Sequence, residues 1–317
     1  MRIILLASGD FAAPTLRWLA QSEHDLPLVI TQPSRPSGRG RRLAATPVGD
    51  LADTLGIETL QTPDVNASDV LARARSLDAR LALTAAFGQK LGPAWLAGFP
   101  GGCLNLHASL LPKYRGAAPI HAAILQGEAR TGCTVFRMTD RMDAGPVLVT
   151  RWTHITPEET AGQLHDRLSR IGVDAVDAAL RQFDGGQIPS GTPQDDAEAT
   201  TAPKLSKRDG FVRLDRDVAA VTRHIRAMTP WPGAAARYAS AAGQWERLTI
   251  VTARADPIAT RPDVPPGTID ARRYVAARDG FVEILEVKPS SGRLMTWADY
   301  VNGRHVQAGD RIVSPDD

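Results

Sequence analysis

The chain has 317 residues, 43% of them apolar and 23% charged, a composition that suits a globular protein with room for two domains. Its formal net charge of +2 does not by itself indicate a nucleic-acid partner. No stretch approaches the roughly 18 apolar residues of a membrane span, and Asp10 interrupts an N-terminal apolar run that is too short for a signal peptide. We therefore expect a soluble, cytoplasmic protein without membrane attachment.

The two cysteines, Cys103 and Cys133, lie within apolar runs. This placement favours reduced, buried thiols over a disulfide. No Cys/His spacing matches a zinc site, so we expect no bound metal.

The first half of the chain alternates strand-like and helix-like segments. Apolar runs predict strands at 2–8, 27–32, 57–60, 79–88, 101–108, 131–138 and 146–152. Helical patterns lie between them, and the longest covers 158–183. This alternation predicts an α/β domain with a doubly wound, mostly parallel sheet, in which ligands bind at the carboxyl ends of strands.

The second half has a different pattern. Residues 186–210 are rich in Pro, Gly, Ser, Thr and charge without periodicity, which predicts a linker. A helix at 217–228 and several short strands follow, including a hairpin around Asp279-Gly280. We expect a catalytic domain over 1–185 and, over 211–317, a small β-barrel of the oligonucleotide-binding kind.

Asn105 and His107 are two polar residues in an otherwise apolar strand. Because residues i and i+2 of a strand share a face, their side chains point the same way and need partners. Asp143, which follows the next strand and precedes a Gly-Pro turn, is a candidate partner. Such a set combines a base, a carboxylate that orients it and an amide that stabilises an oxyanion. The plainer interpretation is a core histidine whose hydrogen bonds are satisfied.

No nucleophile stands in a recognisable elbow sequence. Ser109 follows His107 by two residues, but it leads into a Pro-containing loop that is better suited to lining a pocket. These features favour direct acyl transfer between two bound substrates over a covalent relay.

The stretches NLHASLLPKYRGAAPI and TVFRMTDRMDAGPVL closely resemble the formyltransferase family that uses 10-formyltetrahydrofolate. The resemblance implies that Asn105, His107 and Asp143 are catalytic. It also implies that the folate co-substrate lies near two loops and the turn before Asp143, and the folate contacts implied are Ser109, Leu110, Leu111, Pro112, Phe87, Gly88, Leu91 and Asp140.

The stretch TQPSRPSGRGRRLAATPVG carries four arginines and no acid, which suits contacts to phosphates, although a merely solvated basic loop is the alternative. It resembles the loop that methionyl-tRNA formyltransferases insert at the acceptor end of tRNA. KLSKRD, HIRAMTPWPG, PPGTI and GRLMTWADYVNG extend the resemblance almost end to end. The tRNA contacts implied are Arg35, Arg39, Arg41, Arg42, Lys204, Lys207 and Arg293.

One departure from the family lies at the end of the first strand. There the family has Gly-Thr-Pro, and this chain has Ala7-Ser8-Gly9. Phe11 remains in place as a wall of the implied aminoacyl pocket.

The resemblance implies formyl transfer from 10-formyltetrahydrofolate to the α-amino group of methionyl initiator tRNA, by a monomer. Three alternatives stay open on the sequence. They are formylation of an amino-sugar nucleotide, hydrolysis of 10-formyltetrahydrofolate, and RNA binding by a catalytically idle scaffold.

Overall fold

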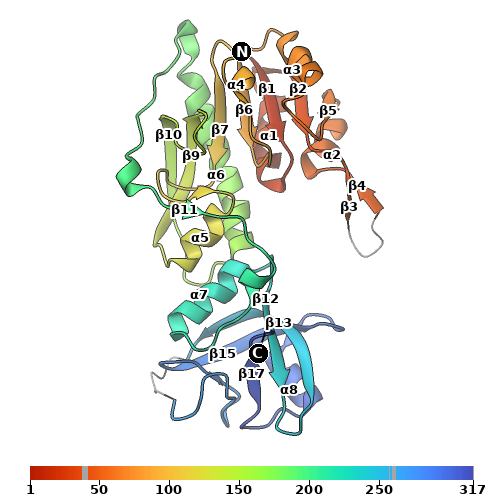
Figure 1. The fold of residues 1–317 in the computed structure, drawn as a ribbon, viewed down its shortest axis with the longest axis vertical. Coiled ribbons are helices and arrows are strands. Elements are labelled where there is room, and N and C mark those ends of the chain that lie inside the picture. The colour runs from red at the N-terminus through yellow and green to blue at the C-terminus, as the bar shows by residue number, and fades with distance from the viewer. Residues whose placement is uncertain (38–41, 257, 259–261, 317) are drawn as a thin grey trace. The chain divides into compact units, whose positions relative to one another are not determined.

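The computed structural model describes residues 1–37, 42–256, 258 and 262–316, and the chain forms two compact units (Figure 1). The N-terminal unit comprises Met1–Pro119, Arg130–Thr153 and His165–Thr201. The C-terminal unit comprises Ile120–Ala129, His154–Leu164 and the chain from Ala202 onward. None of the described helices is long and apolar enough to cross a membrane.

A seven-stranded sheet in the order β10-β9-β7-β6-β1-β2-β5 forms the centre of the N-terminal unit. The pairs from β5 through β7 are parallel, and β9 runs antiparallel to β7. This confirms the predicted mostly parallel sheet. The strands are β1 (Arg2–Ala7), β2 (Asp25–Thr31), β5 (Thr59–Gln61), β6 (Leu81–Ala85), β7 (Cys103–His107), β9 (Arg130–Arg137) and β10 (Val147–His154).

The central strands are apolar because both faces of the sheet are covered. All five residues of β6 are buried, and so are the last five of β1. Four helices lie between strands of the sheet along the chain, α1 (Ala13–Gln21), α2 (Pro47–Thr54), α3 (Ser68–Arg75) and α4 (Pro93–Leu96). Helix α6 (Ala161–Arg181) follows β10, and most of it belongs to the same unit, whereas α5 (Pro119–Leu125) belongs almost entirely to the C-terminal unit.

Local sequence sets where these helices begin. The Thr46 hydroxyl accepts a hydrogen bond from the Gly49 N–H at 3.0 Å, and Pro47 occupies the first turn of α2. A short antiparallel hairpin, β3 (Arg35–Ser37) and β4 (Arg42–Ala44), precedes this helix. The predicted contacts Arg39 and Arg41 lie outside the described residues.

The C-terminal unit contains an antiparallel, nearly closed β-barrel with the strand order β14-β15-β13-β12-β17, which confirms the barrel prediction. Its elements are α7 (Val218–Met228), β12 (Ala234–Ala239), β13 (Trp245–Ala255), β14 (Val275–Ala276), β15 (Phe281–Pro289), β16 (Met295–Thr296), α8 (Trp297–Arg304) and β17 (Arg311–Val313). Alternate residues of β12 are buried, as one core-facing side of a strand requires. The predicted Asp279-Gly280 hairpin joins β14 to β15.

Two short strands complete the chain, β8 (Arg115–Gly116) and β11 (Thr201–Ala202). β8 follows the loop that leaves the carboxyl end of β7. That end of the sheet is where a doubly wound fold binds its ligands.

Candidate active site

Asn105 is the middle residue and His107 the last residue of β7, which lies between β6 and β9. Asn105 is the register partner of Thr84 in β6, and the Thr84 hydroxyl donates to Asn105 Oδ1 at 2.6 Å. In the described part of the chain no group accepts a hydrogen bond from Asn105 Nδ2. The amide therefore has its oxygen engaged and its two N–H donors available to a ligand.

His107 is buried, with 6% of its surface exposed, and one ring nitrogen has an unambiguous partner. Nε2 lies 2.9 Å from the carbonyl oxygen of Tyr114. Because a carbonyl only accepts hydrogen bonds, Nε2 carries the proton of the neutral ring. Nδ1 is then the basic nitrogen, and it lies 3.8 Å from Asp143 Oδ2.

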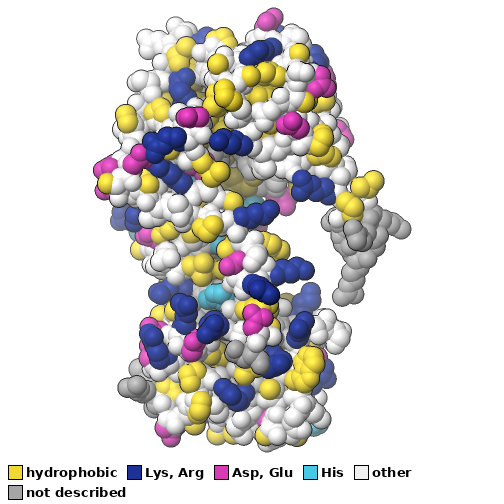
Figure 2. Space-filling view, in the orientation of Figure 1, with side chains coloured by type: hydrophobic (Ala, Val, Ile, Leu, Met, Phe, Trp, Pro, Cys, Tyr) yellow, Lys and Arg dark blue, Asp and Glu magenta, His cyan; other side chains and the backbone are white. Residues whose placement is uncertain are grey.

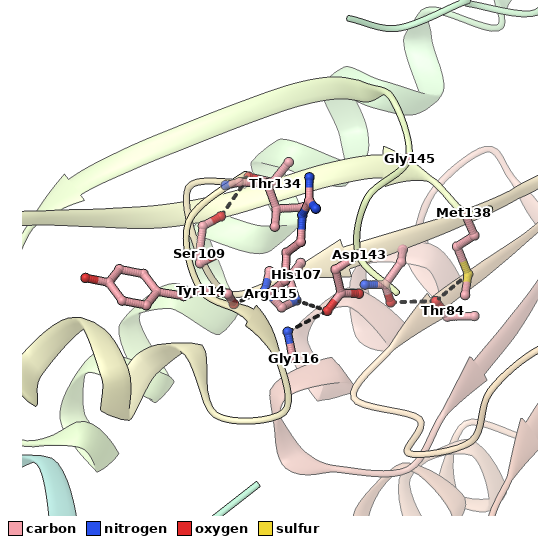
Figure 3. Close-up of polar contacts among 12 residues, drawn as sticks. Thr84, His107, Ser109, Tyr114, Arg115, Gly116, Thr134, Met138, Asp143 and Gly145 are labelled. Atoms are coloured by element: carbon pink, nitrogen blue, oxygen red, sulfur yellow. Dashed lines mark hydrogen bonds and ion pairs between the residues drawn. The ribbon is translucent and has the colours of Figure 1, made fainter. Parts of the chain in front are cut away.

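Asp143 comes from the turn between β9 and β10. Its Oδ2 accepts the Gly116 N–H at 2.8 Å and faces His107 (Figure 3). At 3.8 Å the carboxylate and a neutral Nδ1 share no hydrogen bond, but protonation of Nδ1 creates an ion pair there. The carboxylate is therefore placed to act as the counter-ion of a protonated His107. The structure brings together the His and Asp that the sequence pairs.

The residues that resemblance assigns to folate differ in how far they are exposed. Phe87 and Leu91, with 4% and 2% of their surfaces exposed, belong to the core beneath the sheet. Gly88 and Asp140 are exposed, and Leu110, Leu111 and Pro112 are half-buried. Ser109 is fully buried, and its hydroxyl donates to the Lys113 carbonyl at 2.6 Å. A buried hydroxyl engaged in this way stabilises the loop and is not placed to act as a nucleophile.

Phe11, the implied wall of an aminoacyl pocket, is 6% exposed and meets His165 edge-on, with 5.4 Å between ring centroids. Ser8, which departs from the family pattern three residues before Phe11, has a structural role. Its hydroxyl accepts from the Gln32 N–H at 3.0 Å and from the Thr31 hydroxyl at 3.2 Å. Ser8 thus ties the end of β1 to the end of β2.

The cations assigned to tRNA are exposed wherever their side chains are described. Arg35 lies in β3 and hydrogen-bonds Gln32, while Lys204, Lys207 and Arg293 belong to the C-terminal unit. Among the described residues none of these four forms an ion pair. The backbone of Arg42 lies in β4.

Sequence reasoning missed several residues that surround Asn105, His107 and Asp143. Thr84 holds Asn105, and the segment after α6 contacts the loops that carry Tyr114 and Asp143. Thr84 belongs to an apolar strand, and only the register between β6 and β7 could have indicated that it faces Asn105. The segment after α6 has the composition of a linker and gives no local signal of these contacts.

No three His, Cys, Asp or Glu side chains in the described part of the chain are placed to hold a metal ion.

The family model "Formyl transferase" matches residues 1–180, and "Formyl transferase, C-terminal domain" matches residues 204–305. Two similar full-length relatives bear the name methionyl-tRNA formyltransferase. The one from Acidiphilium cryptum is 39% identical over 98% of this chain and 100% of its own length. The one from Xanthomonas euvesicatoria is 39% identical over 96% of this chain and 98% of its own length.

Among solved structures, the chain is similar to WlaRD, described as a sugar 3N-formyl transferase in the presence of dTDP and 5-N-formyl-THF. The TM-score is 0.63 at 14% identity, with 92% of this chain and 99% of the other covered. At that identity the likeness establishes the shared fold.

Proposed function

This chain belongs to the methionyl-tRNA formyltransferase family, and on that premise we propose that Asn105, His107 and Asp143 carry out its formyl transfer. The activity itself, formylation of methionyl-tRNA, follows from full-length relatives at 39% identity that match both domains. The observation that supports the residue roles is the geometry of His107, whose basic Nδ1 faces the Asp143 carboxylate.

The reaction begins with attack of the methionine α-amino nitrogen on the formyl carbon. A free α-amino group has a pKa of about 7.7–8.0, and an ester at the neighbouring carbonyl lowers it, so the nucleophile is neutral near pH 7. As the new N–C bond forms, the amine loses a proton to His107 Nδ1. The imidazolium is stabilised by Asp143 on one side, and its Nε2–H remains bonded to the Tyr114 carbonyl.

Negative charge develops on the formyl oxygen as the tetrahedral intermediate forms. Asn105 Nδ2 supplies the hydrogen bond to this oxyanion, a contribution of about 3–4 kcal/mol where a comparable donor has been removed. The intermediate collapses when the bond from the formyl carbon to the folate nitrogen breaks. His107 returns its proton to that nitrogen, so that neither a metal nor an external base is consumed.

We propose 10-formyltetrahydrofolate as the donor. The residues that fit it are the half-buried Leu110, Leu111 and Pro112 of the loop after β7, which offer an apolar surface beside His107. Because Phe87 is packed in the core, the 87–91 segment offers its backbone to a ligand and not that ring. The likeness to WlaRD, whose description includes 5-N-formyl-THF, is consistent with this donor.

We propose methionyl initiator tRNA as the acceptor, held by the Arg-rich stretch around β3 and β4 and by the C-terminal unit. Residues 202–317 carry 18 Lys and Arg against 14 Asp and Glu, whereas the whole chain is nearly balanced. Lys and Arg side chains are numerous on the face of the C-terminal unit turned to the viewer in Figure 2. Several arginines of this unit pair with acids, but Lys204, Lys207 and Arg293 are exposed and form no ion pair among the described residues, which suits contacts to a phosphate backbone. The affinity for tRNA should then fall as salt rises.

The acceptor is tested by offering 10-formyltetrahydrofolate with methionyl initiator tRNA, with a dTDP-linked amino sugar, or with water alone. We expect formylmethionyl-tRNA as the main product, and Arg39→Ala should weaken tRNA binding while leaving folate binding unchanged. Faster formylation of the amino sugar, or folate turnover on water at the same rate, would contradict the tRNA assignment.

A further inference from the structure

The segment 192–200, here called the strap, contacts both loops that surround His107. At its start Thr192 and Val147 exchange two backbone hydrogen bonds of 2.8 Å, next to the turn that carries Asp143. Its composition predicts a linker, yet 165–201 clusters with the N-terminal unit. The strap is therefore an integral part of the N-terminal unit and not a linker between units.

Gln194 is the centre of the strap and uses both ends of its amide. Nε2 donates to the carbonyl oxygens of Asp143 at 2.9 Å and Gly145 at 2.7 Å. Oε1 accepts from Nε and Nη2 of Arg115 at 3.1 and 2.9 Å. Carbonyls only accept and guanidinium groups only donate, so the orientation of this amide is fixed by its partners.

Arg115 is in turn held by one acid of the strap, Asp196, and by the strap's backbone. Its guanidinium pairs with Asp196 at 2.9 Å, and Asp196 also pairs with Arg141 at 2.7 Å. Hydrogen bonds from Arg141 and Arg115 lower the pKa of Asp196, which keeps it ionised at neutral pH. These pairs join the loop after β7 to the turn after β9.

Thr200 fixes the other partner of His107. Its hydroxyl accepts the Tyr114 N–H at 2.9 Å, and its carbonyl accepts the Arg115 N–H at 2.9 Å. The Tyr114 carbonyl is the group that determines which nitrogen of His107 is protonated. The strap thus holds both neighbours of the imidazole, one on each ring nitrogen.

Both neighbours need such support because their backbones are strained. Tyr114 has φ +62° and Asp143 has φ +50°, the left-handed region that non-glycine residues rarely adopt. Such conformations persist where the surrounding structure over-determines them. The strap supplies these constraints through Thr200 at Tyr114 and through Gln194 at Asp143.

We propose that the strap sets the spacing between His107 and Asp143, with Gln194 as its main positioning residue. This inference rests on the proposed roles of His107 and Asp143. Without the two hydrogen bonds from Gln194, the turn relaxes from its left-handed conformation and the carboxylate leaves Nδ1. The imidazolium then loses its counter-ion, and the chemical step slows without a change in substrate binding.

The test compares Gln194→Met, which keeps the length of the side chain and removes its hydrogen bonds, with Gln182→Met as a matched control. Gln182 also donates from Nε2 to a backbone carbonyl, that of Leu148 at 3.1 Å. Leu148 belongs to β10 and not to the turn that carries Asp143. Both variants are measured alone and combined with Asp143→Asn. The readouts are kcat, KM for methionyl-tRNA and for 10-formyltetrahydrofolate, and the thermal midpoint.

We expect Gln194→Met to lower kcat about tenfold with both KM values within twofold, whereas Gln182→Met leaves kcat unchanged. In the Asp143→Asn background, the further loss from Gln194→Met should be less than threefold, because the contact it maintains is already gone. If Asp143→Asn lowers kcat but Gln194→Met does not, or if the two losses multiply fully, the positioning role is wrong. If Asp143→Asn itself leaves kcat intact, the proposed catalytic set fails instead.

Discussion

Thr84 donates a 2.6 Å hydrogen bond to Oδ1 of Asn105 from the adjacent parallel strand, and its side chain is almost wholly buried. The same hydroxyl lies 3.1 Å from the Leu104 carbonyl and 3.4 Å from Met138 Sδ, but it has only one proton. The shortest contact is to the amide. Thr84 therefore holds the Asn105 amide by its oxygen and leaves the N–H donors for the proposed contact with the formyl oxygen.

Thr84→Val, which replaces the hydroxyl with a methyl group of similar size, should lower kcat about tenfold. The amide then rotates freely, and its N–H is no longer directed at the oxyanion, a smaller loss than removal of the donor itself. KM for both substrates should stay within twofold in steady-state assays. Thr84→Ser, which restores the hydroxyl, should recover most of the rate. Equal rates for the Val and Ser variants would show that the hydroxyl does not orient Asn105.

Gly145→Ala should disrupt the turn that carries Asp143. A Cβ at this position would lie 1.8 Å from the Arg137 carbonyl oxygen, a backbone atom that cannot move aside easily. We expect a loss of about 1–3 kcal/mol in the free energy of unfolding, measured in urea, together with lower kcat. Gly303→Ala is the control. It lies in α8 with open space around its Cβ, so alanine should stabilise by about 0.5–1 kcal/mol.

Cys103 and Cys133 should resist thiol reagents in the folded protein. Burial raises the pKa of each thiol to about 12, and both residues are at most 1% exposed. At pH 8 only about one thiol in 10⁴ is then ionised, so modification should be at least about 10³-fold slower than for a free cysteine. In urea, where the chain is unfolded, both thiols should instead react quickly, at two equivalents of reagent per chain. Rapid stoichiometric modification under native conditions would contradict this burial.

Asp310 should stabilise the barrel in a pH-dependent way. Burial alone would raise its pKa, but hydrogen bonds from the Gln307 N–H, the Tyr238 hydroxyl and the Ala241 N–H together hold that pKa below its usual value. A lowered folded-state pKa means that the contribution is fully present above the ordinary Asp value, about pH 4, and is lost as pH falls through the folded pKa.

Asp310→Asn should therefore cost about 2–3 kcal/mol in the free energy of unfolding at pH 7, because an amide N–H group replaces an acceptor among three donors. Tyr238→Phe, which removes one donor, should cost about 1 kcal/mol. The deficit of Asp310→Asn relative to the wild type should shrink below pH 4 in denaturant titrations. A deficit independent of pH would mean that the charge of Asp310 does not matter.

Much of the fold follows from local pattern. Apolar runs such as 2–8 and 101–108 form the central strands, and the Thr-Pro pair at 46–47 begins α2. The alternation of strands and helices is enough to predict the parallel sheet, because buried strands on a two-sided sheet must be apolar throughout. No comparable sequence pattern indicates that β9 runs antiparallel, because its direction depends on its pairing with β7.

The candidate catalytic site was predictable only in part. The i, i+2 spacing of Asn105 and His107 indicates a shared face, whereas the supporting residues come from tertiary contacts. Gln194 lies 51 residues from the Asp143 carbonyl it holds, in a stretch whose composition indicates only a linker. The strained backbone at Asp143 could not be predicted from the sequence either, because aspartate has no local preference strong enough to predict a positive φ there.

Single-turnover kinetics show whether His107 is the base of the formyl transfer. Preformed enzyme–methionyl-tRNA complex is mixed with 10-formyltetrahydrofolate, and wild type is compared with His107→Ala at saturating concentrations of both substrates. We predict a loss of about 10²–10⁴ in the single-turnover rate, with tRNA affinity unchanged. A rate within a few-fold of wild type would contradict the account, because the amine would then lose its proton without His107.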